Sequence, residues 1–546
     1  MASIEHLHLW LSGFAFLWIA FSMVAAGLGL WRKTEWRGAP VLPMQRMSVA
    51  ILIPIHNEDP AAVFGNAAAL LEDLAAKKAA EGFSLYVLSD TRDEAIAQRE
   101  WQAFQLLQME QASRFEIFYR RRAENTDRKT GNIADWVTGW GARHEAMLVL
   151  DADSLMSADA VLAMREVLAT DPGLGLVQTW PRILRAEGMF ARVQQFVTSA
   201  HGWLLARGLQ AWTGGSANYW GHNAIIRTRA FAAAAGLPHL CSRITRRETL
   251  IMSHDFVEAA MLRRAGWRVR FLPEIDGSYE ETPTSLMDHI QRDRRWCRGN
   301  LQHLRLLAAR GLHPVSRFHL LQGAVSYLLA PVWLVLMAIW AVPHMSEMPL
   351  GVDGAPPAPM LVEGFGSGGG LLLVAVLLML LGPKLVSVTS ILLSGRAKEF
   401  GGVGTFLAAA LAEIAISVIY APILMVQQVL SVITATVSAR DIWAAQRRGG
   451  GEQSWAVLLR FHLPETLLGA TAVIGIGLGV VTPWLAPIAL SLVLAVPLSW
   501  LSDRRTTMLA SPEDLSLPEI ARRAGTARAR YATGLLAAPR YAVAAE

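Results

Sequence analysis

The sequence predicts an open, mostly parallel α/β sheet domain inserted between α-helical membrane segments. Hydrophobic residues make up 53% of the 546 positions and charged residues only 17%. Together with a mean hydropathy of +0.32, this is more apolar material than a soluble core needs. Charged residues crowd between Arg32 and Arg310, and long apolar runs lie outside that interval. A polar domain held between membrane segments accounts for both observations.

The first apolar segment, Leu9–Leu30, predicts a membrane helix. Its length of about 22 residues is enough to cross a bilayer. A secretory signal would carry basic residues before the apolar core, whereas here Glu5 precedes it and Arg32 and Lys33 follow. We therefore expect the N-terminus in the periplasm and Arg32 in the cytoplasm.

Short, nearly continuous apolar runs predict the strands of a buried parallel sheet. Stretches with helical character, such as Pro60–Glu81, separate them, and this alternation favours an open sheet covered on both faces. The predicted strands are Val49–Pro54, Ser84–Leu88, Phe115–Tyr119, Ala146–Leu150 and Gly175–Thr179.

Long apolar segments return toward the C-terminus. Basic flanks on both sides of Phe406–Val432 require an even number of crossings, but the segment is too short for two helices of about 20 residues. We therefore expect a re-entrant or interfacial hairpin bent near Pro422. Leu467–Leu501, interrupted at Pro483 and Pro487, can hold two short or tilted spans. The full set of predicted segments is Phe318–Val342, Leu371–Leu393, Phe406–Val432 and Leu467–Leu501.

These patterns divide the chain into four parts. Residues 1–47 form a membrane helix and linker, and residues 48–310 form the cytoplasmic α/β domain. Residues 311–502 form a membrane region with interfacial helices. Residues 503–546, rich in Ala and Arg, are expected to be a weakly specified cytoplasmic tail.

The basic balance of the chain does not indicate nucleic acid as a partner. The net charge is +5, but the Arg and Lys residues lie mainly beside apolar segments or inside motifs, as the positive-inside rule predicts. The two cysteines, Cys241 and Cys297, both lie in the charged middle portion, where thiols stay reduced. No disulfide framework is expected.

Two carboxylates, Asp151 and Asp153, directly follow the predicted strand Ala146–Leu150. Ligands of open α/β sheets bind at the carboxyl ends of the strands. Carboxylates there can hold Mg²⁺ or Mn²⁺, which neutralises a departing nucleotide diphosphate. The alternative is a helix N-cap formed by Asp153.

Three further polar residues are candidates for nucleotide binding. Asp90, after Ser84–Leu88, can accept hydrogen bonds from a base or ribose, and Glu58 has a corresponding place after the first strand. Lys129 is expected on a glycine-containing turn, where an ammonium can meet phosphate or uracil oxygens. The alternatives are ordinary turn carboxylates and a solvated surface lysine.

Asp255 is the candidate general base, because it precedes the helical pattern Phe256–Ala265 and can deprotonate an acceptor hydroxyl. An N-cap is the alternative. Downstream, Arg292 and Arg295 can grip a diphosphate, and Trp296 offers an apolar face to a sugar ring. Their alternative is an amphipathic interfacial helix with snorkelling arginines. Glu413, inside an apolar segment, is expected to line a polymer path, with an interfacial position as the alternative.

The joint order of these motifs resembles the family 2 processive glycosyltransferases, such as bacterial cellulose and hyaluronan synthases. The resemblance covers the chain from about Val49 to the tail and implies a GT-A glycosyltransferase domain. The segments that carry it are Arg128-Lys129-Thr130-Gly131-Asn132, Tyr219-Trp220-Gly221-His222-Asn223, Ser253-His254-Asp255 and Arg292-Asp293-Arg294-Arg295-Trp296-Cys297.

Carried over to this sequence, the resemblance implies that Asp90 and Lys129 hold UDP and that Asp151 and Asp153 act through the metal. It further implies that Asp255 is the base.

Toward the membrane, the resemblance implies that Arg292 and Arg295 bind diphosphate and that Trp296 stacks at the channel entrance. The acceptor end would be lined by Gly221, His222 and Asn223.

Two departures from cellulose synthases favour the branch that builds osmoregulated periplasmic glucans. Arg292 stands where those enzymes usually have Gln, and Ser253-His254 stands in place of Thr-Glu. The resemblance then implies an inner-membrane enzyme that transfers glucose from UDP-glucose to a growing β-glucan, β-1,2-linked, with inversion. Acyl carrier protein and periplasmic glucan-processing proteins are the implied partners. Another β-glycan synthase, making cellulose or mannan, and a membrane scaffold without turnover are the alternatives.

Overall fold

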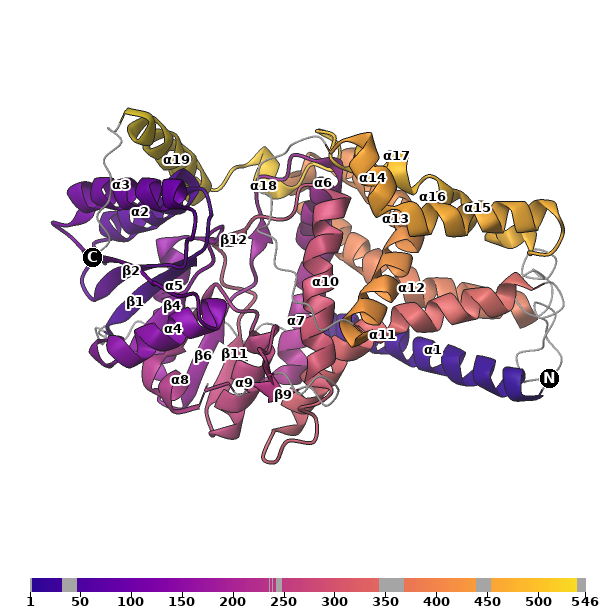
Figure 1. Cartoon of the computed structure of the whole chain (residues 1–546), viewed down its shortest axis with the longest axis horizontal. Helices are drawn as coiled ribbons and strands as arrows, with labels where there is room; N and C mark the ends of the chain where they lie inside the picture. Colours follow the sequence, from indigo (N-terminus) through magenta and orange to yellow (C-terminus); the bar gives the residue numbers. More distant parts are fainter. Residues whose placement is uncertain are drawn as a thin grey trace.

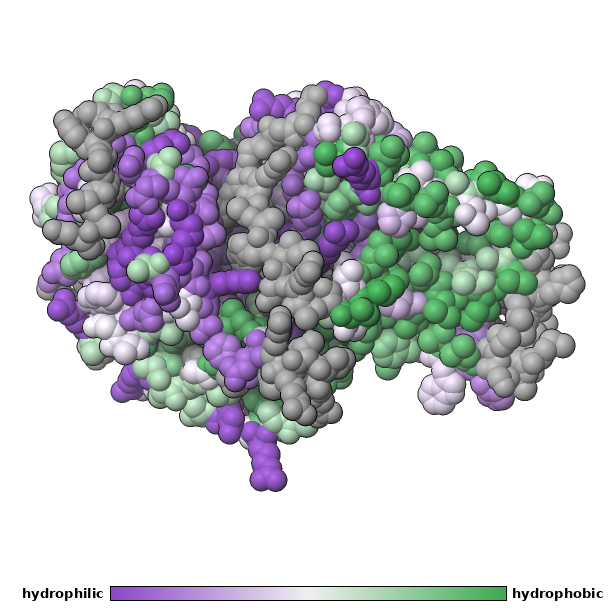
Figure 2. Space-filling model, viewed as in Figure 1, coloured by the Kyte–Doolittle hydropathy of each residue, from purple (hydrophilic) through white to green (hydrophobic). Residues whose placement is uncertain are grey.

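The computed structural model describes residues 2–31, 47–234, 236–237, 239–241, 248–342, 368–437 and 453–537. An α/β body lies on one side and long apolar helices extend from the other, with α10 (Leu286–His303) running across between them (Figure 1). Figure 2 shows the same division on the surface, which is mostly polar over the body and mostly apolar over the extended helices. The predicted linker at 32–46 and the loop at 343–367 lie outside the described residues.

The body is built on one seven-stranded sheet with the strand order β11-β6-β8-β4-β1-β2-β3. Strand β8 runs antiparallel to both its neighbours, and the other pairs are parallel. Every predicted strand is confirmed. The strands of this sheet are β1 (Val49–Ile55), β2 (Phe83–Ser89), β3 (Glu116–Arg121), β4 (Ala146–Val149), β6 (Leu174–Gln178), β8 (Ala224–Arg227) and β11 (Arg268–Phe271).

Helices cover both faces of the sheet, as predicted. Side chains of a strand alternate between its two faces, and in β1 Ile51 and Ile53 enter one apolar core while Ala50 and Leu52 enter the other. The helices of the first face are α2 (Pro60–Ala76), α3 (Glu94–Gln111), α5 (Ala158–Thr170) and α19 (Glu519–Ala537). Those of the second include α4 (Arg128–Gly139), α7 (Trp203–Thr213), α8 (Thr228–Ala234) and α9 (His254–Arg264).

The strand order reverses at β1, because the chain passes from β1 to β2 and β3 on one side and then returns to β4 on the other. Pairing between β1 and β4 ends at Leu52 and Val149, whereas β1 stays paired with β2 as far as Ile55. Pro54 therefore lies beyond the end of β4, where its missing N–H leaves no gap in that ladder. The two strands part at the topological switch point, where ligands of such sheets bind.

A second, three-stranded sheet in the order β5-β12-β7 lies beyond this point. Its strands are β5 (Leu155–Met156), β7 (Arg182–Ile183) and β12 (Ser278–Glu280). Because β12 pairs with β5, the chain near residue 280 is brought beside the segment that follows Asp153.

Three helices among the described residues are long and apolar enough to cross a membrane: His6–Trp31 in α1 (Ala2–Trp31), α11 (Pro314–Ala341) and α13 (Val403–Val437). Helix α12 (Gly368–Leu393) extends in the same direction as α1 and α11 (Figure 1). The segment expected to hold two short or tilted spans contains two apolar helices, α15 (Leu463–Gly477) and α16 (Ala486–Val493). Helix α14 (Trp455–Phe461) bends by 69° into α15, and the segment Pro483–Val493 bends by 53° into α17 (Ala495–Ser502).

The predicted hairpin at Pro422 is wrong, since α13 is one continuous helix of 35 residues. Proline removes a backbone hydrogen bond inside a helix, and such a break is tolerated where neighbouring side chains supply partners. The missing N–H of Pro422 would have bonded the Val418 carbonyl; Ser491 of α16 donates its hydroxyl to the neighbouring carbonyl of Ile419 at 2.5 Å and so ties this part of α13 to α16. Tyr420 also ties α13 to the next helix, because its hydroxyl donates to the Leu498 carbonyl at 2.9 Å.

Helix α1 meets α7 backbone to backbone. A Cβ atom at Gly29 would lie 2.2 Å from the carbonyl oxygen of Leu204, and one at Gly208 would lie 2.0 Å from that of Ala25. Only glycine allows such an approach at these two positions. The first apolar helix is therefore fixed directly to the α/β body.

The prediction of a weakly specified tail is wrong for residues 519–537. Helix α19 docks on α2 and α3 at the end of the body (Figure 1). Tyr531, 1% exposed, stacks on Phe64 and donates its hydroxyl to Glu110 at 3.0 Å. Sequence composition hides this docking because alanine and arginine dominate the segment and only scattered larger side chains face the body.

We predict that Tyr531→Ala loosens α19 by about 3 to 5 kcal/mol, the cost of removing a buried aromatic side chain. Hydrogen exchange along α19 should accelerate, and a protease should cut there sooner. Leu536→Ala, at a position 87% exposed, is the control and should leave both measurements unchanged. Equal protection of α19 in the Tyr531 variant and the parent would contradict the docking.

Candidate active site

The two carboxylates Asp151 and Asp153 lie on the loop directly after β4. The loop is closed by its own hydrogen bonds, because the Asp151 amide donates to the Ser154 hydroxyl at 2.8 Å and the Ser154 amide to the Asp151 carbonyl at 3.0 Å. Helix α5 begins later, capped by Ser157. The N-cap alternative for Asp153 is therefore wrong.

Lys129 reaches this loop from α4. Its ammonium forms an ion pair with Asp151 and also donates to the carbonyl oxygen of Gly221 at 2.8 Å. The predicted glycine-containing turn is in fact the first turn of α4. Gly131 is needed in that turn because a Cβ would lie 2.1 Å from the Thr126 carbonyl oxygen. The solvated-surface alternative for Lys129 is wrong.

Asp255 lies on the other side of Gly221. Gly221 has a φ of +88°, and a Cβ placed on it would lie 3.6 Å from Asp255 Oδ2, so the backbone here is close to the carboxylate. Asp255 belongs to the first turn of α9, whose cap position is Ser253, and the N-cap alternative is wrong for this residue too. Burial raises the pKa of Asp255, which is what a general base near neutral pH needs.

His222 and Glu280 lie next to Asp151 and Asp153 and form a cluster with them. His222 Nε2 lies 3.3 Å from Glu280 Oε2. Burial alone would lower the pKa of His222, but the carboxylates of Asp151 and Glu280 outweigh it and raise the pKa. Burial raises the pKa of Glu280, with Asp153 acting in the same direction. Both residues thus belong to the electrostatic surroundings of the Asp151–Asp153 loop.

Glu280 was missed in the sequence because β12 is only three residues long, too short for periodicity to reveal. The adjacent acidic pair Glu280-Glu281, just before Pro283, is the one signal that pointed to it.

Helix α10 brings the basic and aromatic groups. The Arg292 guanidinium lies 4.6 Å from the ring centroid of Trp296, and the indole is 48% exposed. Burial lowers the pKa of Arg292, while Glu280 and Asp153 counteract this, so Arg292 faces the acidic cluster. Arg295 lies on the same helix, and its assignment to diphosphate stays a prediction.

The same helix holds the segment that carries Asp255. A Cβ at Gly299 would lie 2.1 Å from the Ser253 hydroxyl oxygen, and His303 Nε2 is 2.9 Å from the Ser253 carbonyl oxygen. Gln302 bonds the backbone on either side of Ile251, through the Met252 amide and the Leu250 carbonyl. Helix α10 therefore positions both Arg292 and the start of α9.

Asp90 is 4% exposed, and both its oxygens receive hydrogen bonds from Arg122, at 2.7 and 2.9 Å. A nucleotide bound here would therefore contact the Asp90 carboxylate while it is ion-paired with Arg122. Glu58 accepts a hydrogen bond from the His56 amide, which places it at the end of β1. Nucleotide contacts of Asp90 and Glu58 remain predictions.

Asn223 does not line an acceptor path in this structure. Its side chain is fully buried and donates to the Ser278 hydroxyl at 3.0 Å and the Tyr279 carbonyl at 3.1 Å. Asn223 therefore connects β12 to the main sheet. A sequence motif does not distinguish this structural role from contact with a ligand. Gly221 and His222 do lie at the cluster.

Glu413 also differs from its assignment. Its carboxylate has 0% exposure and forms an ion pair with Lys384 of α12 at 2.6 Å, joined by the Ser417 hydroxyl at 2.6 Å. The pair links two apolar helices, and the buried carboxylate forms no wall of an open path.

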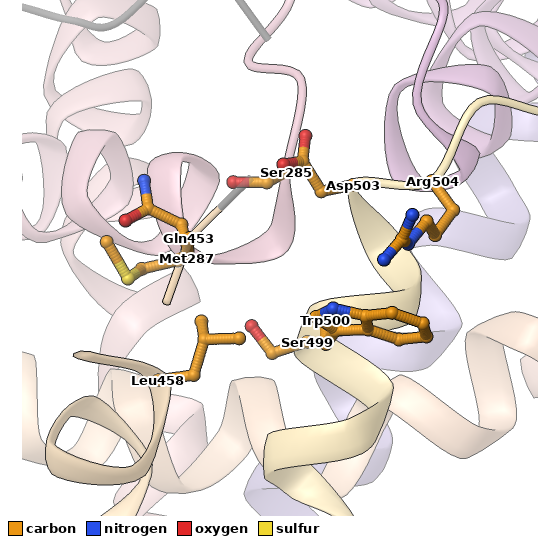
Figure 3. A pocket seen from close by; sticks show the side chains of 8 residues that line it. All are labelled: Ser285, Met287, Gln453, Leu458, Ser499, Trp500, Asp503 and Arg504. Carbon is orange, nitrogen blue, oxygen red and sulfur yellow. The ribbon is translucent and has the colours of Figure 1, made fainter. Parts of the chain in front are cut away.

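A separate pocket lies between the start of α10 and the C-terminal helices (Figure 3). Arg504 lies 3.9 Å from the centroid of the Trp500 ring, and the two planes face each other in the view. None of the predicted site residues lines it, so it is distinct from the carboxylate cluster. Its lining residues are Ser285, Met287, Gln453, Leu458, Ser499, Trp500, Asp503 and Arg504.

The donor set around Asp151 fits a metal only in part. Within the described ranges, no group of three or more His, Cys, Asp or Glu side chains is arranged to hold a metal ion by itself. Mg²⁺ commonly binds through one or two carboxylates and takes its remaining ligands from substrate phosphates and water. The pair Asp151 and Asp153 fits this kind of site, at the strand end where a diphosphate is expected.

The chain is a family 2 glycosyltransferase. The family model of "Glycosyl transferase family group 2" matches residues 146–382, which include the carboxylate loop, Asp255 and α10. Among solved structures, a mannosyltransferase, PcManGT from Pyrobaculum calidifontis in complex with GDP-Man and Mn2+, is similar with a TM-score of 0.45 and 16% identity. That match covers 71% of this chain and 98% of the mannosyltransferase.

Curated relatives give the family more closely. Glucans biosynthesis glucosyltransferase H from Xanthomonas oryzae pv. oryzae is 37% identical over 94% of this chain and 83% of its own. The Caulobacter vibrioides protein of that name is 37% identical over 88% and 75%, and the Rhodopseudomonas palustris protein 39% over 92% and 72%. The chain belongs to the glucans biosynthesis glucosyltransferase H family and is a hexosyltransferase of glucan synthesis. This confirms the predicted resemblance.

Gly299→Ala tests the contact between α10 and α9. The added methyl group has to displace Ser253 and with it the first turn that carries Asp255, and displacements near 1 Å cost about 100-fold in rate. We expect kcat for sugar transfer to fall by roughly that factor. The dissociation constant for the nucleotide, measured by calorimetry, should change little.

The matched control is Gly139→Ala in α4, where a Cβ meets nothing within 4 Å. It should retain the parental rate. A Gly299 variant with parental kcat would show that Asp255 does not depend on α10.

Proposed function

We propose that the chain is a processive inverting glucosyltransferase that uses UDP-glucose and extends a β-glucan, the β-1,2-linked backbone of osmoregulated periplasmic glucans. Residues 48–310 are the cytoplasmic catalytic domain, and residues 311–502 pass the polymer across the inner membrane. The relatives' name supports glucan synthesis, and the apolar helices support a membrane location.

The observation that carries the proposal is the convergence on Gly221. Lys129 bonds its carbonyl, Asp255 packs against its α-carbon, and Asp151 accepts from the same ammonium. One backbone position is thus bordered both by the candidate base and by the ion pair of Lys129 with Asp151, as a shared site for sugar transfer would need.

In the proposed reaction, Asp255 accepts the proton of the acceptor hydroxyl, and the resulting oxygen attacks the anomeric carbon of the donor glucose. The bond from that carbon to the UDP oxygen breaks on the opposite face, so the configuration inverts and a β linkage forms. Arg292 and Arg295 bind the negative charge that develops on the departing diphosphate. Trp296 offers its exposed face to the acceptor sugar.

Asp151 and Asp153 would hold Mg²⁺ or Mn²⁺ when the donor is bound. The ion supplies charge neutralisation on the diphosphate. Lys129 then serves to orient Asp151 and to keep its carboxylate from repelling the phosphates. Gly221 and His222 lie where the acceptor end must approach.

The direct test is synthesis by the purified full chain in liposomes supplied with UDP-glucose alone. We expect UDP release together with a β-1,2-linked glucan recovered from the liposomes. A parallel panel of UDP- and GDP-sugars with linkage analysis distinguishes a cellulose- or mannan-type product. Asp255→Asn should lose about 100- to 10,000-fold in rate, the usual contribution of a general base. UDP release by the parent that does not exceed the background and is unchanged in Asp151→Asn would instead favour a scaffold without turnover.

The raised pKa of Asp255 predicts the pH dependence. The base works only when ionised, so activity must fall as the pH falls through its pKa. Because burial raises that pKa, the acidic limb of kcat/KM should lie above the value of about 3.9 for an ordinary aspartate. A rate that stays level down to about pH 4, with the protein still folded by circular dichroism, would contradict Asp255 as the base.

A further inference from the structure

We propose that Arg528, on the C-terminal helix α19, is a positioning residue for the carboxylate loop of the active site. The inference rests on the proposed function, because it assigns to Arg528 the control of how Asp151 and Asp153 present a divalent cation to a nucleoside diphosphate. Arg528 itself touches neither carboxylate.

The first connection runs through α2 to the loop. Arg528 Nε donates to Asn66 Oδ1 at 3.0 Å, and Asn66 Nδ2 donates to the Ser154 carbonyl oxygen at 3.3 Å. Ser154 is the residue whose hydroxyl accepts from the Asp151 amide. The asparagine is buried, and arginine fixes which end of its amide faces the loop, because only the oxygen can accept from a guanidinium.

The second connection runs to the opposite wall of the site. Arg528 Nη2 lies 2.8 Å from Glu281 Oε1, which also receives Arg185 Nη1 at 2.9 Å. Burial alone would raise the pKa of Glu281, but the two guanidinium groups outweigh it and lower the pKa. Glu281 directly follows Glu280, the partner of His222. The guanidinium of Arg528 is thus connected to the carboxylate loop through Asn66 and to the end of β12 through Glu281.

Apolar side chains do not completely fill the space under the carboxylate loop. The hydrogen bonds of Asn66 to Ser154 and to Arg528 therefore contribute to holding the loop in place. A small cavity lies beneath it. Asn66 is the one amide side chain among its lining residues, which are Ile53, Val63, Asn66, Ala67, Leu70, Leu150, Asp151, Ala152, Ser154 and Met156. The hydrogen bond from Asn66 to the Ser154 carbonyl therefore supports the loop from the side of this cavity.

Close approach of the two helices brings Arg528 into reach. A Cβ at Gly65 would lie 2.7 Å from the Cα of Arg528. Gly65 thus lets the backbone of α19 lie against α2 one residue before Asn66. A larger residue at this position has to push Arg528 away without changing its charge.

Three variants of the full chain in liposomes test the proposal: Arg528→Ala, Arg528→Lys and Gly65→Leu. We expect Arg528→Ala and Gly65→Leu to raise the Mn²⁺ concentration for half-maximal UDP release by about 10-fold or more, the usual effect of removing a residue that orients a metal ligand. Binding of Mn²⁺ in the presence of UDP, followed by the electron paramagnetic resonance signal of the free ion, should weaken to the same extent. Arg528→Lys, which can reach only one of the two acceptors, should show an intermediate value.

The matched control is Arg523→Ala. Arg523 lies on the same helix and pairs with Glu519 one turn away, so its loss removes an equal charge without touching Asn66 or Glu281. It should bind Mn²⁺ and UDP as the parent does. A merely stabilising arginine would lower the amount of folded protein without changing metal affinity.

Parental Mn²⁺ binding in both Arg528→Ala and Gly65→Leu would overturn the proposal, as would an equal loss in Arg523→Ala. The binding measurement does not need turnover. A parent that binds Mn²⁺ and UDP but makes no glucan would refute the proposed function, while Arg528 would still be tested.

Discussion

The ammonium of Lys129 holds together an arrangement that would otherwise repel itself. Asp151, Asp153 and Glu280 bring negative charge to one edge of the sheet, with Asp255 close by on α9. Carboxylates so near one another disfavour ionisation unless cations lie among them. Lys129 binds Asp151 from one side, and Arg292 faces Glu280 and Asp153 from the other. Cations thus lie among the carboxylates at both Asp151 and Glu280.

Helix α10 connects this chemistry to the apolar helices. Helix α10 carries Arg292 and also carries Gly299 and His303, which contact Ser253. Arg294 of the same helix donates to Gln427 of α13 at 2.6 Å, and Gln427 in turn donates to Glu465 of α15. Polar side chains of α10 therefore contact both Ser253, two residues before Asp255, and the apolar helix α13, which is bonded in turn to α15. Any rearrangement of those helices must therefore act on α10, and through it on Arg292 and on the segment before Asp255.

Much of the fold and most of the cluster could be predicted from the sequence, because buried parallel strands leave long apolar runs and the residues after them must converge. Asp151 was found in this way, whereas a glycine-containing segment indicated Lys129 and a place just before a helical pattern indicated Asp255. The remainder depends on contacts between segments far apart in the chain. Glu280 lies on a strand too short for a pattern, and Arg528 follows Asn66 by more than 400 positions. Arg122 forms an ion pair with Asp90, and the Ser491 hydroxyl bonds the Ile419 carbonyl near Pro422. Local composition predicts neither contact.

The crossing of α1 and α7 at Gly29 and Gly208 has a mechanical consequence. Two helices in backbone contact cannot slide or rotate against each other without a steric clash, so the angle between α1 and the sheet is constant. If α1 stands in the bilayer, the catalytic groups are held at a set height above the lipid surface.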